Sequence, residues 1–498
     1  MSRPAWWRPH SGTDALKFSQ LPGFPKLFLD FVDHDSRVES FFPCRPDLQS
    51  LRNHAGVLAA RSYPRGQLQA VLEVQAQRFH SGQSAYENIG RVGREDTLVV
   101  LTGDPAGLFG GPLSTLWKAL SAIKLSNFLN EQGLPAVPVF WMQSRAIDVP
   151  QPPSLLLVDR EGRRHMLRLG NRSSGDPDST GVASVPPEIE QVLAGLKEFV
   201  GDEATEVLEL LRNAYTPGTA ISSAFARFFS RLMEDWGLIF VNPDEPDFKE
   251  LWESFHSRVE PEAERIRELV KAQQLRLAQA GSGSAADLAS ITTLLFQQTI
   301  LPGVASVADP HEYSVVACSL PALQALGIPP PVVWPRISAT IIETRILKLL
   351  ERYELRWDDL LAGCDAVIQA VAGRKPKAAT AQDFDTVTRE ISRRLEDLFA
   401  ALPPEHQSLK EVIEESKSKM IYQVNKMRDK FLAGHDLRQR TIRRQITRAC
   451  ESVAPDRELQ ERRIASLQFL FRYSAGFVRT VYDKIDIGKF EHQVVVVD

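Results

Sequence analysis

Short apolar runs alternate with amphipathic stretches over much of the chain. The run "TLVVLTG" (97–103) stops at a glycine and predicts a buried strand. After Pro112, apolar residues recur at three- and four-residue steps as far as Phe128, and Gly133 provides a stop signal, so this stretch predicts a helix. The run "PAVPVFWM" (135–142) predicts a second buried strand. A strand, a helix and a strand within about forty-five residues form a βαβ unit, which implies a parallel sheet.

Other apolar runs continue this pattern towards the middle of the chain. The stretch "SLLLVDREGRRHMLRL" (154–169) predicts an antiparallel hairpin that turns at "DREG". The stretches "GLIFVNP" (237–243) and "PPPVVWPRISATII" (329–342) each predict one further strand. Residues 247–278 predict one long helix, which "AGSGSAAD" closes. Three more stretches predict helices: 47–60, 65–80 and most of 187–235.

The C-terminal third has a different apolar pattern. Beyond the polar linker "GRKPKAATAQ" (373–382), a helical stripe runs through Val387, Ile391, Leu395 and Leu398, and "LPPEHQ" interrupts it. A second stripe follows at alternating four- and three-residue steps: Leu409, Ile413, Ser416, Met420, Val424, Met427 and Phe431. Charged residues lie between its members over about three heptads, which is typical of a coiled coil. The alternative is an amphipathic helix packed on a globular body, but the charge density and the Pro-Pro break favour a helical arm.

Composition and charge narrow the class of protein. The 498 residues are 43% hydrophobic and 24% charged, with a formal net charge of −4, which indicates a folded protein of two or more structural units. A net charge of this sign and size indicates neither the basic surface that binds nucleic acid nor a polybasic membrane anchor. The sequence also lacks an apolar signal segment and any uncharged apolar run of about 18 residues, so we expect a cytoplasmic protein with neither nucleic-acid nor membrane partners.

Cysteines and histidines are scattered in the sequence. Cys44, Cys318, Cys364 and Cys450 lie far apart and form no CxxC pair, which fits a reducing compartment better than a disulfide framework. The ten histidines show no HxxxH or HxH spacing. We therefore expect no metal site.

A glycine-rich stretch, "TGDPAGLFGGPLSTLWK" (102–118), lies between the first predicted strand and its helix. Its glycines allow a close backbone approach to a ligand or a positive φ, and the helix N-terminus beyond them offers N–H groups to an anion. The spacing matches neither GxGxxG nor GxxxxGK[ST], so a tight structural turn is at least as well supported as a phosphate cradle. The candidate residues are Thr102, Gly103, Gly107, Gly110, Gly111, Pro112, Ser114, Thr115 and Lys118.

Polar residues also follow two other apolar runs. The second predicted strand is followed by Gln143, Ser144, Arg145 and Asp148. Ligands gather at such strand ends in open parallel sheets, although Arg145 and Asp148 could simply pair with each other. Arg336 and Ser338 follow "VVWP"; the arginine either binds a carboxylate or phosphate or forms a structural ion pair. The sequence contains no GxSxG nucleophile elbow.

Five long stretches together resemble one known family. They are "VVLTGDPAGLFGGPLSTLWKALSAIKL", "LPAVPVFWMQS", "LLRNAYTPGTAISSAFARFFSRLMEDWGLIFVNPDEPDFKEL", "GIPPPVVWPRISATIIETRILKLLERYEL" and "LQERRIASLQFLFRYS". They are similar to the cysteine-adding ligases of bacillithiol biosynthesis over nearly the whole chain. The resemblance implies an α/β fold: a Rossmann-like, nucleotidyl-transferase-type core with a parallel sheet and helical insertions, and a helical coiled-coil arm.

The resemblance also implies an activity and partners. The implied reaction joins the carboxylate of cysteine to the amine of glucosaminyl malate as an amide. An adenine nucleotide, ATP or ADP, is the implied cofactor, and a homodimer through the coiled coil is the implied assembly. We expect three parts: the Rossmann-like core over 1–372, the arm over 373–451 and a C-terminal segment over 452–498 that packs back on the core.

The family's motifs, carried onto this chain, mark its candidate site. The candidate catalytic residue is Asp148. The candidate nucleotide- or substrate-binding residues are Thr102, Gly103, Gly107, Gly111, Pro112, Lys118, Ser144, Arg145, Glu312, Arg336 and Ser338.

The chain departs from the family's pattern at three of the expected pocket positions. After Ser144, the family's acidic–acidic–histidine–acidic run is Arg-Ala-Ile-Asp here (145–148), so one acid is kept. The family's Gly-Gln-Gln is Gly-Asp-Pro (103–105), which adds a negative charge and removes a backbone donor, and both changes disfavour an anion there. The family's Gly-Gly-Pro-Gly-Glu is Ala-Asp-Pro-His-Glu (308–312).

These departures keep two alternatives to the cysteine ligase open. One is a catalytically impaired homologue that acts as a dimeric binding or scaffold protein. The other is a ligase for a different amine and acid, in which Arg145 holds the new carboxylate.

Overall fold

The computed structural model describes residues 15–143, 154–159, 161–169, 184–200, 204–282, 286–373, 380–403 and 409–498. They form two compact units. The sheet unit contains the described residues of 15–344 together with 458–498, and the helical unit contains those of 345–457. The three-part division predicted at residues 372 and 451 stays a prediction.

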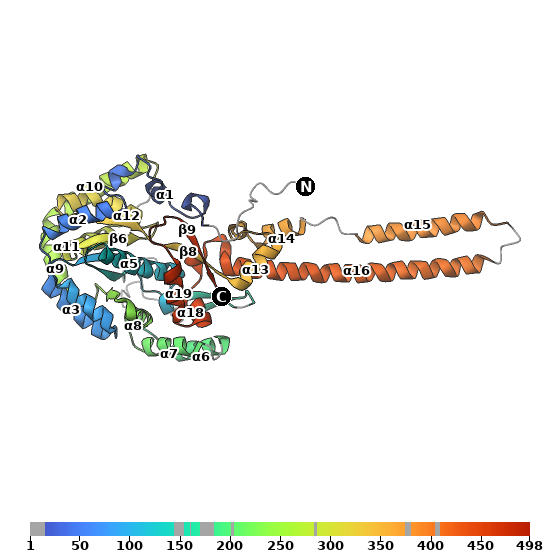
Figure 1. Ribbon diagram of the computed structural model, residues 1–498, viewed down its shortest axis with the longest axis horizontal. Helices are drawn as coiled ribbons and strands as arrows, with labels where there is room; N and C mark the ends of the chain where they lie inside the picture. Colours follow the sequence, from blue (N-terminus) through green and yellow to red (C-terminus); the bar gives the residue numbers. More distant parts are fainter. Residues whose placement is uncertain are drawn as a thin grey trace. The chain divides into compact units, whose positions relative to one another are not determined.

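A five-stranded sheet forms the centre of the sheet unit (Figure 1). All neighbouring strands are parallel, in the order β5-β2-β1-β6-β7. Helix α5 (Leu113–Glu131) connects β1 to β2, which confirms the predicted βαβ unit. The strand order reverses between β1 and β6, the place where open sheets of this kind bind ligands. The strands are β1 (Leu98–Pro105), β2 (Ala136–Gln143), β5 (Ile239–Val241), β6 (Gly303–Ala308) and β7 (Val332–Pro335).

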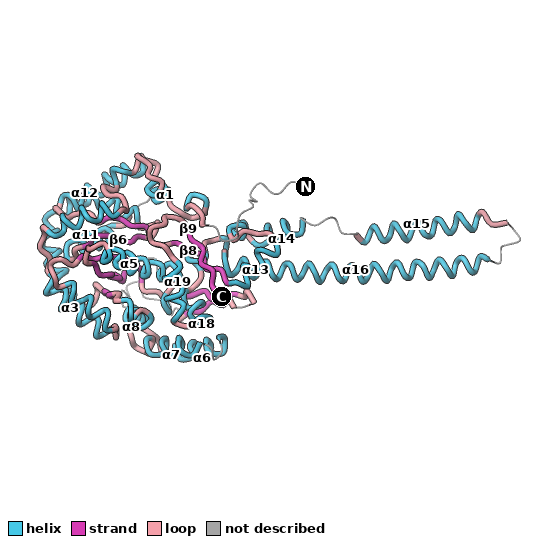
Figure 2. Tube along the Cα trace, in the orientation of Figure 1, coloured by secondary structure: helices cyan, strands magenta, loops and turns pink. Residues whose placement is uncertain are grey.

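Helices surround this sheet (Figure 2), and a separate apolar core covers each of its faces. On β1, Leu98 and Val100 belong to the first core, while Val99 and Leu101 belong to the second. Because both faces are buried, the strands appear in the sequence as continuous apolar runs. Besides α5, the first core contains α2 (Leu48–Ala59), α6 (Ile189–Val200), α7 (Thr205–Ala214), α8 (Ile221–Leu232), α18 (Ser466–Tyr473) and α19 (Gly476–Lys484). The second contains α1 (Lys26–Val32), α3 (Arg65–Arg78), α4 (Gln83–Val92), α9 (Lys249–Val259), α10 (Ala263–Gln279), α11 (Leu288–Ile300) and α12 (Tyr313–Ala325).

The predicted hairpin is confirmed, but two other predicted elements are wrong. Strands β3 (Ser154–Val158) and β4 (Arg164–Arg168) pair antiparallel. The single helix predicted over 247–278 is α9 followed by α10, because Pro261 lies between them in a short 3-10 turn and has no N–H to continue the α-helical ladder.

The strand predicted over 329–342 is likewise two strands. After β7 the chain leaves the main sheet, and β8 (Ser338–Glu343) pairs in parallel with β9 (His492–Val497). Neither β6 nor β9 was predicted from the apolar pattern.

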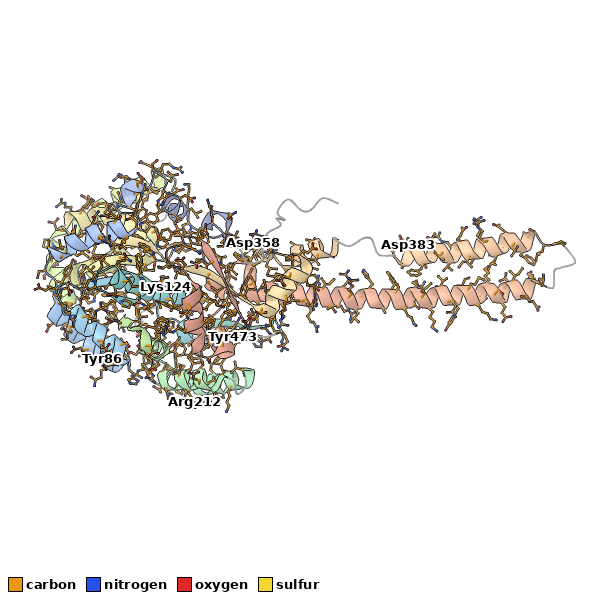
Figure 3. All side chains as sticks on the ribbon, in the orientation of Figure 1. Tyr86, Lys124, Arg212, Asp358, Asp383 and Tyr473 are labelled. Carbon is orange, nitrogen blue, oxygen red and sulfur yellow. The ribbon has the colours of Figure 1, made fainter. Side chains whose placement is uncertain are left out.

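The helical unit contains an antiparallel pair of long helices. These are α15 (Ala381–Ala400) and α16 (Leu409–Val453). The start of α15 is capped through Thr380 and Asp383, the latter labelled in Figure 3. The Phe384 and Phe431 rings lie 5.7 Å apart, and Lys417 forms a 2.7 Å ion pair with Glu396. The predicted coiled coil is therefore formed between two helices of one chain. The second stripe is only partly internal, because Val424 is buried while Met420 and Met427 are exposed.

Candidate functional site

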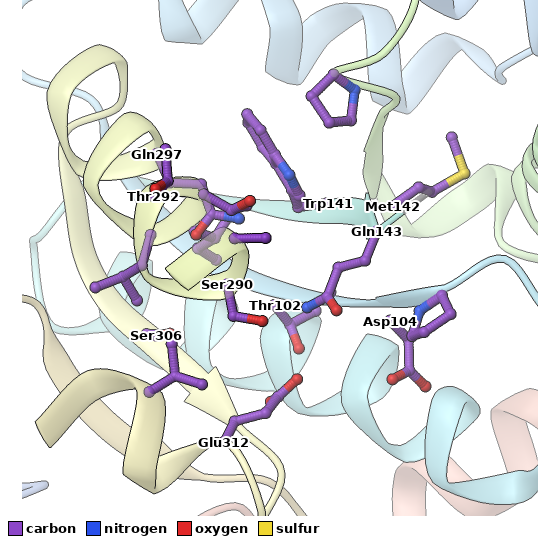
Figure 4. Close-up of a pocket in the computed structure, with 18 of the residues that line it drawn as sticks. Thr102, Asp104, Trp141, Met142, Gln143, Ser290, Thr292, Gln297, Ser306 and Glu312 are labelled. Atoms are coloured by element: carbon purple, nitrogen blue, oxygen red, sulfur yellow. The ribbon is translucent and has the colours of Figure 1, made fainter. Parts of the chain in front are cut away.

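The carboxyl ends of three parallel strands border a cavity of about 1290 Å³ (Figure 4). Its wall contains 101–105 of β1, 141–143 of β2 and 306–309 at the end of β6, together with 243–246 after β5. Helices α9 and α11 and the start of α12 complete the lining. This is the edge, and the point of strand reversal, at which open parallel sheets bind ligands.

Lys118 of α5 is the central cation of the cavity floor. Its side chain is 2% exposed, and its Nζ donates to the Gly103 carbonyl at 2.8 Å, Asp104 Oδ1 at 3.0 Å and Glu312 Oε1 at 2.8 Å. Burial lowers the pKa of Lys118, but the two carboxylates outweigh it, so the pKa is raised and the lysine stays charged. Thr115 Oγ1 donates to the other Asp104 oxygen at 2.5 Å. The floor is thus a tightly bonded, charged group of side chains.

Glu312 lies at the start of α12 and points into the cavity (Figure 4). Its second oxygen accepts from the Asp309 N–H at 2.7 Å. Burial raises the pKa of Glu312, Lys118 opposes this shift, and the nearby charges of Asp309 and Asp104 add to it. A carboxyl group whose pKa is raised is suited to proton transfer, so Glu312 is the strongest acid–base candidate among the described lining residues.

Four of the predicted site residues line this cavity together: Thr102, Gly103, Lys118 and Glu312. For two of them the structure also shows a role in the fold. Thr102 Oγ1 donates to the Val307 carbonyl at 3.0 Å, which ties β1 to β6. A Cβ atom on Gly103 would lie 2.2 Å from the Trp141 carbonyl oxygen, so the pairing of β1 with β2 requires glycine there.

The second half of the glycine-rich stretch forms a packed turn and does not line the cavity. Gly110 has a φ of +93°, and a Cβ on it would lie 2.9 Å from the Phe229 ring. The Leu113 N–H at the start of α5 donates to the Ile464 carbonyl at 2.9 Å, so it is occupied by the chain itself. The structural-turn alternative therefore describes Gly107, Gly111 and Pro112.

Arg336 belongs to a buried ion network behind the floor. Its side chain is 1% exposed, with Nε 2.8 Å from Asp309 and Nη2 2.9 Å from Glu461. Ser338 Oγ donates to the same Glu461 oxygen at 2.8 Å. Arg336 and Ser338 do not line the cavity; Arg336 acts on it through Asp309, which does. The structural ion pair is thus the alternative that the geometry favours for Arg336.

The candidates that follow β2 beyond Gln143 lie outside the described residues. These are Ser144, Arg145 and Asp148, which include the predicted catalytic residue. Gln143 itself lines the cavity, and its amide points inward (Figure 4). The roles assigned to the other three stay predictions.

The sequence did not predict much of the cavity wall formed by α9, α11 and the residues after β5. Trp252 lines the cavity and stacks on Phe296 with ring centroids 3.8 Å apart. Asp244 and Glu245 directly follow β5, so the strand-end rule applied to "FVNPDE" would have found them. The polar lining residues of α11 carry no such signal, because helix packing alone brings them to the cavity: Ser290, Thr292, Thr293 and Gln297.

Carboxylates outnumber lysines along the described cavity lining. The carboxylates are Asp104, Asp244, Glu245, Glu253, Asp287, Asp309 and Glu312. Both lysines of this lining are paired, Lys118 as above and Lys249 with Glu253 at 3.7 Å. The charge balance favours a cationic ligand group such as an ammonium over an anion.

Two other kinds of feature are absent from the part of the chain that the structure describes. Within the ranges given above, no cluster of three or more His, Cys, Asp or Glu side chains is arranged to hold a metal ion. None of the described helices is both long and apolar enough to cross a membrane.

Comparison with known proteins agrees with this architecture. Residues 13–297 match the family model "Bacillithiol biosynthesis BshC, N-terminal Rossmann-like domain", and 339–497 match "Bacillithiol biosynthesis BshC, C-terminal coiled-coil domain". The chain is 25% identical to a protein of Koribacter versatilis, over 97% of this chain and 99% of that protein. It is 26% identical to a protein of Solibacter usitatus, over 97% of this chain and 99% of that protein. It is also 26% identical to a protein of Salinibacter ruber, over 95% of this chain and 97% of that protein. All three relatives are named "Putative cysteine ligase BshC".

Proposed function

Because the chain belongs to the BshC family of bacillithiol biosynthesis, we propose that it is a ligase that joins cysteine to glucosaminyl malate through an amide bond. The observation that supports it most directly is the cavity at the strand reversal of a Rossmann-like sheet, with Glu312 and Lys118 on its floor. The cavity is large enough for more than one small molecule, since typical ligand pockets measure about 300–1000 Å³.

Amide formation places two demands on the site. A carboxylate is a poor electrophile, and a bound nucleoside triphosphate would supply the energy to activate it. The attacking amine arrives as an ammonium ion and must lose a proton before its lone pair can react. The excess of carboxylates favours the ammonium form on binding, and Glu312 is placed to accept the proton while Lys118 holds its carboxylate in position.

The adenine nucleotide fits the described residues less well than the amine does. Asp104 occupies the end of β1 beside the start of α5, where an anion would otherwise meet a helix N-terminus. Both lysines of the described lining already pair with carboxylates. The nucleotide therefore remains a proposal that comes from the family resemblance.

We also propose a cytoplasmic homodimer formed through the α15–α16 pair. Its support is a set of large apolar side chains that this pair leaves exposed. A second copy of the chain with the same stripe would cover them as a coiled coil covers its seam. The exposed side chains are Val387, Leu398, Leu409, Val412, Met420, Tyr422, Met427, Phe431 and Leu437.

The decisive experiment incubates the purified chain with ATP, cysteine and glucosaminyl malate and searches by mass spectrometry for the amide. Calorimetry with ATP and ADP tests nucleotide binding separately. If neither product nor nucleotide binding is found, the ligase proposal is overturned and the binding or scaffold alternative is favoured. Product from another amine or acid would instead support the ligase of changed substrate.

Matched variants locate the site. Glu312→Gln keeps the shape of the side chain and should lower the rate at least about 100-fold, the usual contribution of an acid–base group. Asp148→Asn tests the predicted catalytic residue in the same way. The control is Lys124→Met, because Lys124 (Figure 3) lies on the same helix as Lys118 but donates to the Tyr482 carbonyl outside the cavity lining. Unchanged rates in both test variants would show that the chemistry occurs elsewhere.

A further inference from the structure

Two of the four cysteines meet in the helical unit. Cys364 is the first residue of α14 (Cys364–Gly373), and Cys450 lies near the end of α16, which packs against α14. Each thiol affects the pKa of the other, so the two side chains lie beside each other where the helices pack. All of α15 and most of α16 separate them in the sequence, so only the folded unit brings them together.

The two thiols differ in exposure and in acidity. Cys364 is half-buried, whereas Cys450 is 2% exposed. The hydrogen bond from Cys450 lowers the pKa of Cys364, against the opposing effects of burial and of the Glu451 and Asp365 charges. The same hydrogen bond and burial raise the pKa of Cys450. Of the two thiols, the one that solvent reaches is therefore the more acidic.

Packing on both sides keeps the pair in place. Tyr353 Oη donates to Gln445 on α16 at 2.5 Å, and Arg443 lies 3.7 Å from Asp365 on α14. A Cβ atom on Gly363, directly before the cysteine, would lie 2.5 Å from Arg457 Nε, so the start of α14 lies close to the 3-10 turn Pro455–Arg457 that follows α16. These contacts lie on both sides of the two cysteines and hold α14 against the last turns of α16.

We propose that Cys364 and Cys450 form a peroxide-responsive dithiol, in which Cys364 reacts first and Cys450 closes an intramolecular disulfide. The Cys364 thiolate attacks the O–O bond of hydrogen peroxide, forms a sulfenic acid and releases hydroxide, which takes up the proton of the original thiol. The Cys450 sulfur then attacks the sulfenic sulfur, and its proton leaves with the displaced hydroxyl as water. Two thiols are oxidised, and one peroxide is reduced to two water molecules.

The other two cysteines provide internal controls. Burial raises the pKa of both the half-buried Cys44 and the buried Cys318. Among the described residues, no other cysteine affects the pKa of Cys44 or of Cys318. They should react slowly and form no intramolecular disulfide.

The test treats the reduced full-length chain with hydrogen peroxide, alkylates the remaining thiols and maps its peptides without reduction. The expected result is a peptide that links Cys364 to Cys450 and disappears after treatment with dithiothreitol. Limited alkylation of the reduced chain should modify Cys364 at least about 10-fold faster than Cys44, as expected for the more acidic of two partly exposed thiols.

Variants separate the two steps. Cys450→Ser should leave a sulfenic acid on Cys364 that dimedone traps, Cys364→Ser should abolish the disulfide, and Cys44→Ser should change neither. The proposal is overturned if the wild-type map contains no linked peptide, or if Cys364 is modified no faster than Cys44. Both of these measurements use the unaltered chain, so they decide the matter even if a variant fails to fold.

Discussion

Replacing Lys118 by methionine isolates what the cation of the cavity floor contributes to the stability of the fold. Methionine fills a similar volume but removes the charge and the three hydrogen bonds to Gly103, Asp104 and Glu312. The carboxylates of Asp104 and Glu312 then share the floor without the lysine that separates them. Removing one partner of a buried ion pair typically costs about 3–5 kcal/mol, because the remaining charge stays desolvated.

The exposure of the two carboxylates sets the expected magnitude. The side chains of Asp104 and Glu312 are 20% and 30% exposed, so water screens part of their charge. We therefore expect a loss near the lower end of the range, about 3 kcal/mol at pH 7. Amide hydrogen exchange along β1 and α5 measures this loss within the sheet unit, without a contribution from α15 and α16.

The loss should depend on pH in a definite direction. Burial raises the pKa of Glu312 in the native protein, and removal of Lys118 should raise it further. A carboxyl group whose pKa is higher in the folded than in the unfolded chain stabilises the fold only while it is protonated. The deficit of Lys118→Met should therefore be largest above the folded-state pKa of Glu312 and shrink as the pH falls through it.

Two comparisons can refute this reasoning. Adding Glu312→Gln to Lys118→Met removes one of the carboxylates and should restore at least about 1 kcal/mol. Lys124→Met on the same helix should show no such pH dependence. A deficit of equal size at pH 5 and pH 8, or a second loss on adding Glu312→Gln, would show that the floor is not governed by charge pairing.

Three further predictions follow from single contacts. Burial lowers the pKa of His492 from 6.5 to about 4, so between these pH values the unfolded chain binds more protons than the folded one. The free energy of unfolding should therefore fall by about 3 kcal/mol as the pH falls through this window, and in urea unfolding His492→Gln should flatten this dependence on pH. Gly103→Ala forces a Cβ to within 2.2 Å of the Trp141 carbonyl oxygen and should cost at least about 2 kcal/mol in thermal unfolding; an unchanged melting temperature would contradict the close strand pairing. If the exposed stripe of α16 forms the proposed dimer, Met427→Glu should have the mass of a monomer in light scattering. Lys419→Glu, outside the stripe, should keep the mass of the dimer, and a dimer in both variants would exclude this interface.

The strands and helices that the sequence predicts well are those with a strong local signal. Strands β1 and β2 are buried on both faces and therefore appear as unbroken apolar runs, and α5 between them has both start and stop signals. The long helices α15 and α16 are marked by their heptad spacing. Strand β6 was missed because "GVASVA" is short and rich in small residues, which weakens the apolar signal.

The candidate site was only partly predictable, for the same physical reason. The strand-end rule led to Gln143, since the sheet edge is implied by the strands themselves, and the glycine-rich stretch led to Thr102 and Gly103. In the sequence, Arg336 could be either a ligand-binding group or a structural ion pair, because its partners Asp309 and Glu461 come from distant parts of the chain. Nothing near Arg336 in the sequence indicates that both carboxylates lie beside it.

The sequence by itself thus determined the local elements, their order and, through long similar stretches, the family. Periodicity carries this information because it records which face of each element is apolar. Only the tertiary structure decided that Lys118 is a buried cation and not a solvated helix residue, and that Cys364 lies against Cys450. Such facts depend on burial and on contacts between residues far apart in the chain, which no local pattern encodes.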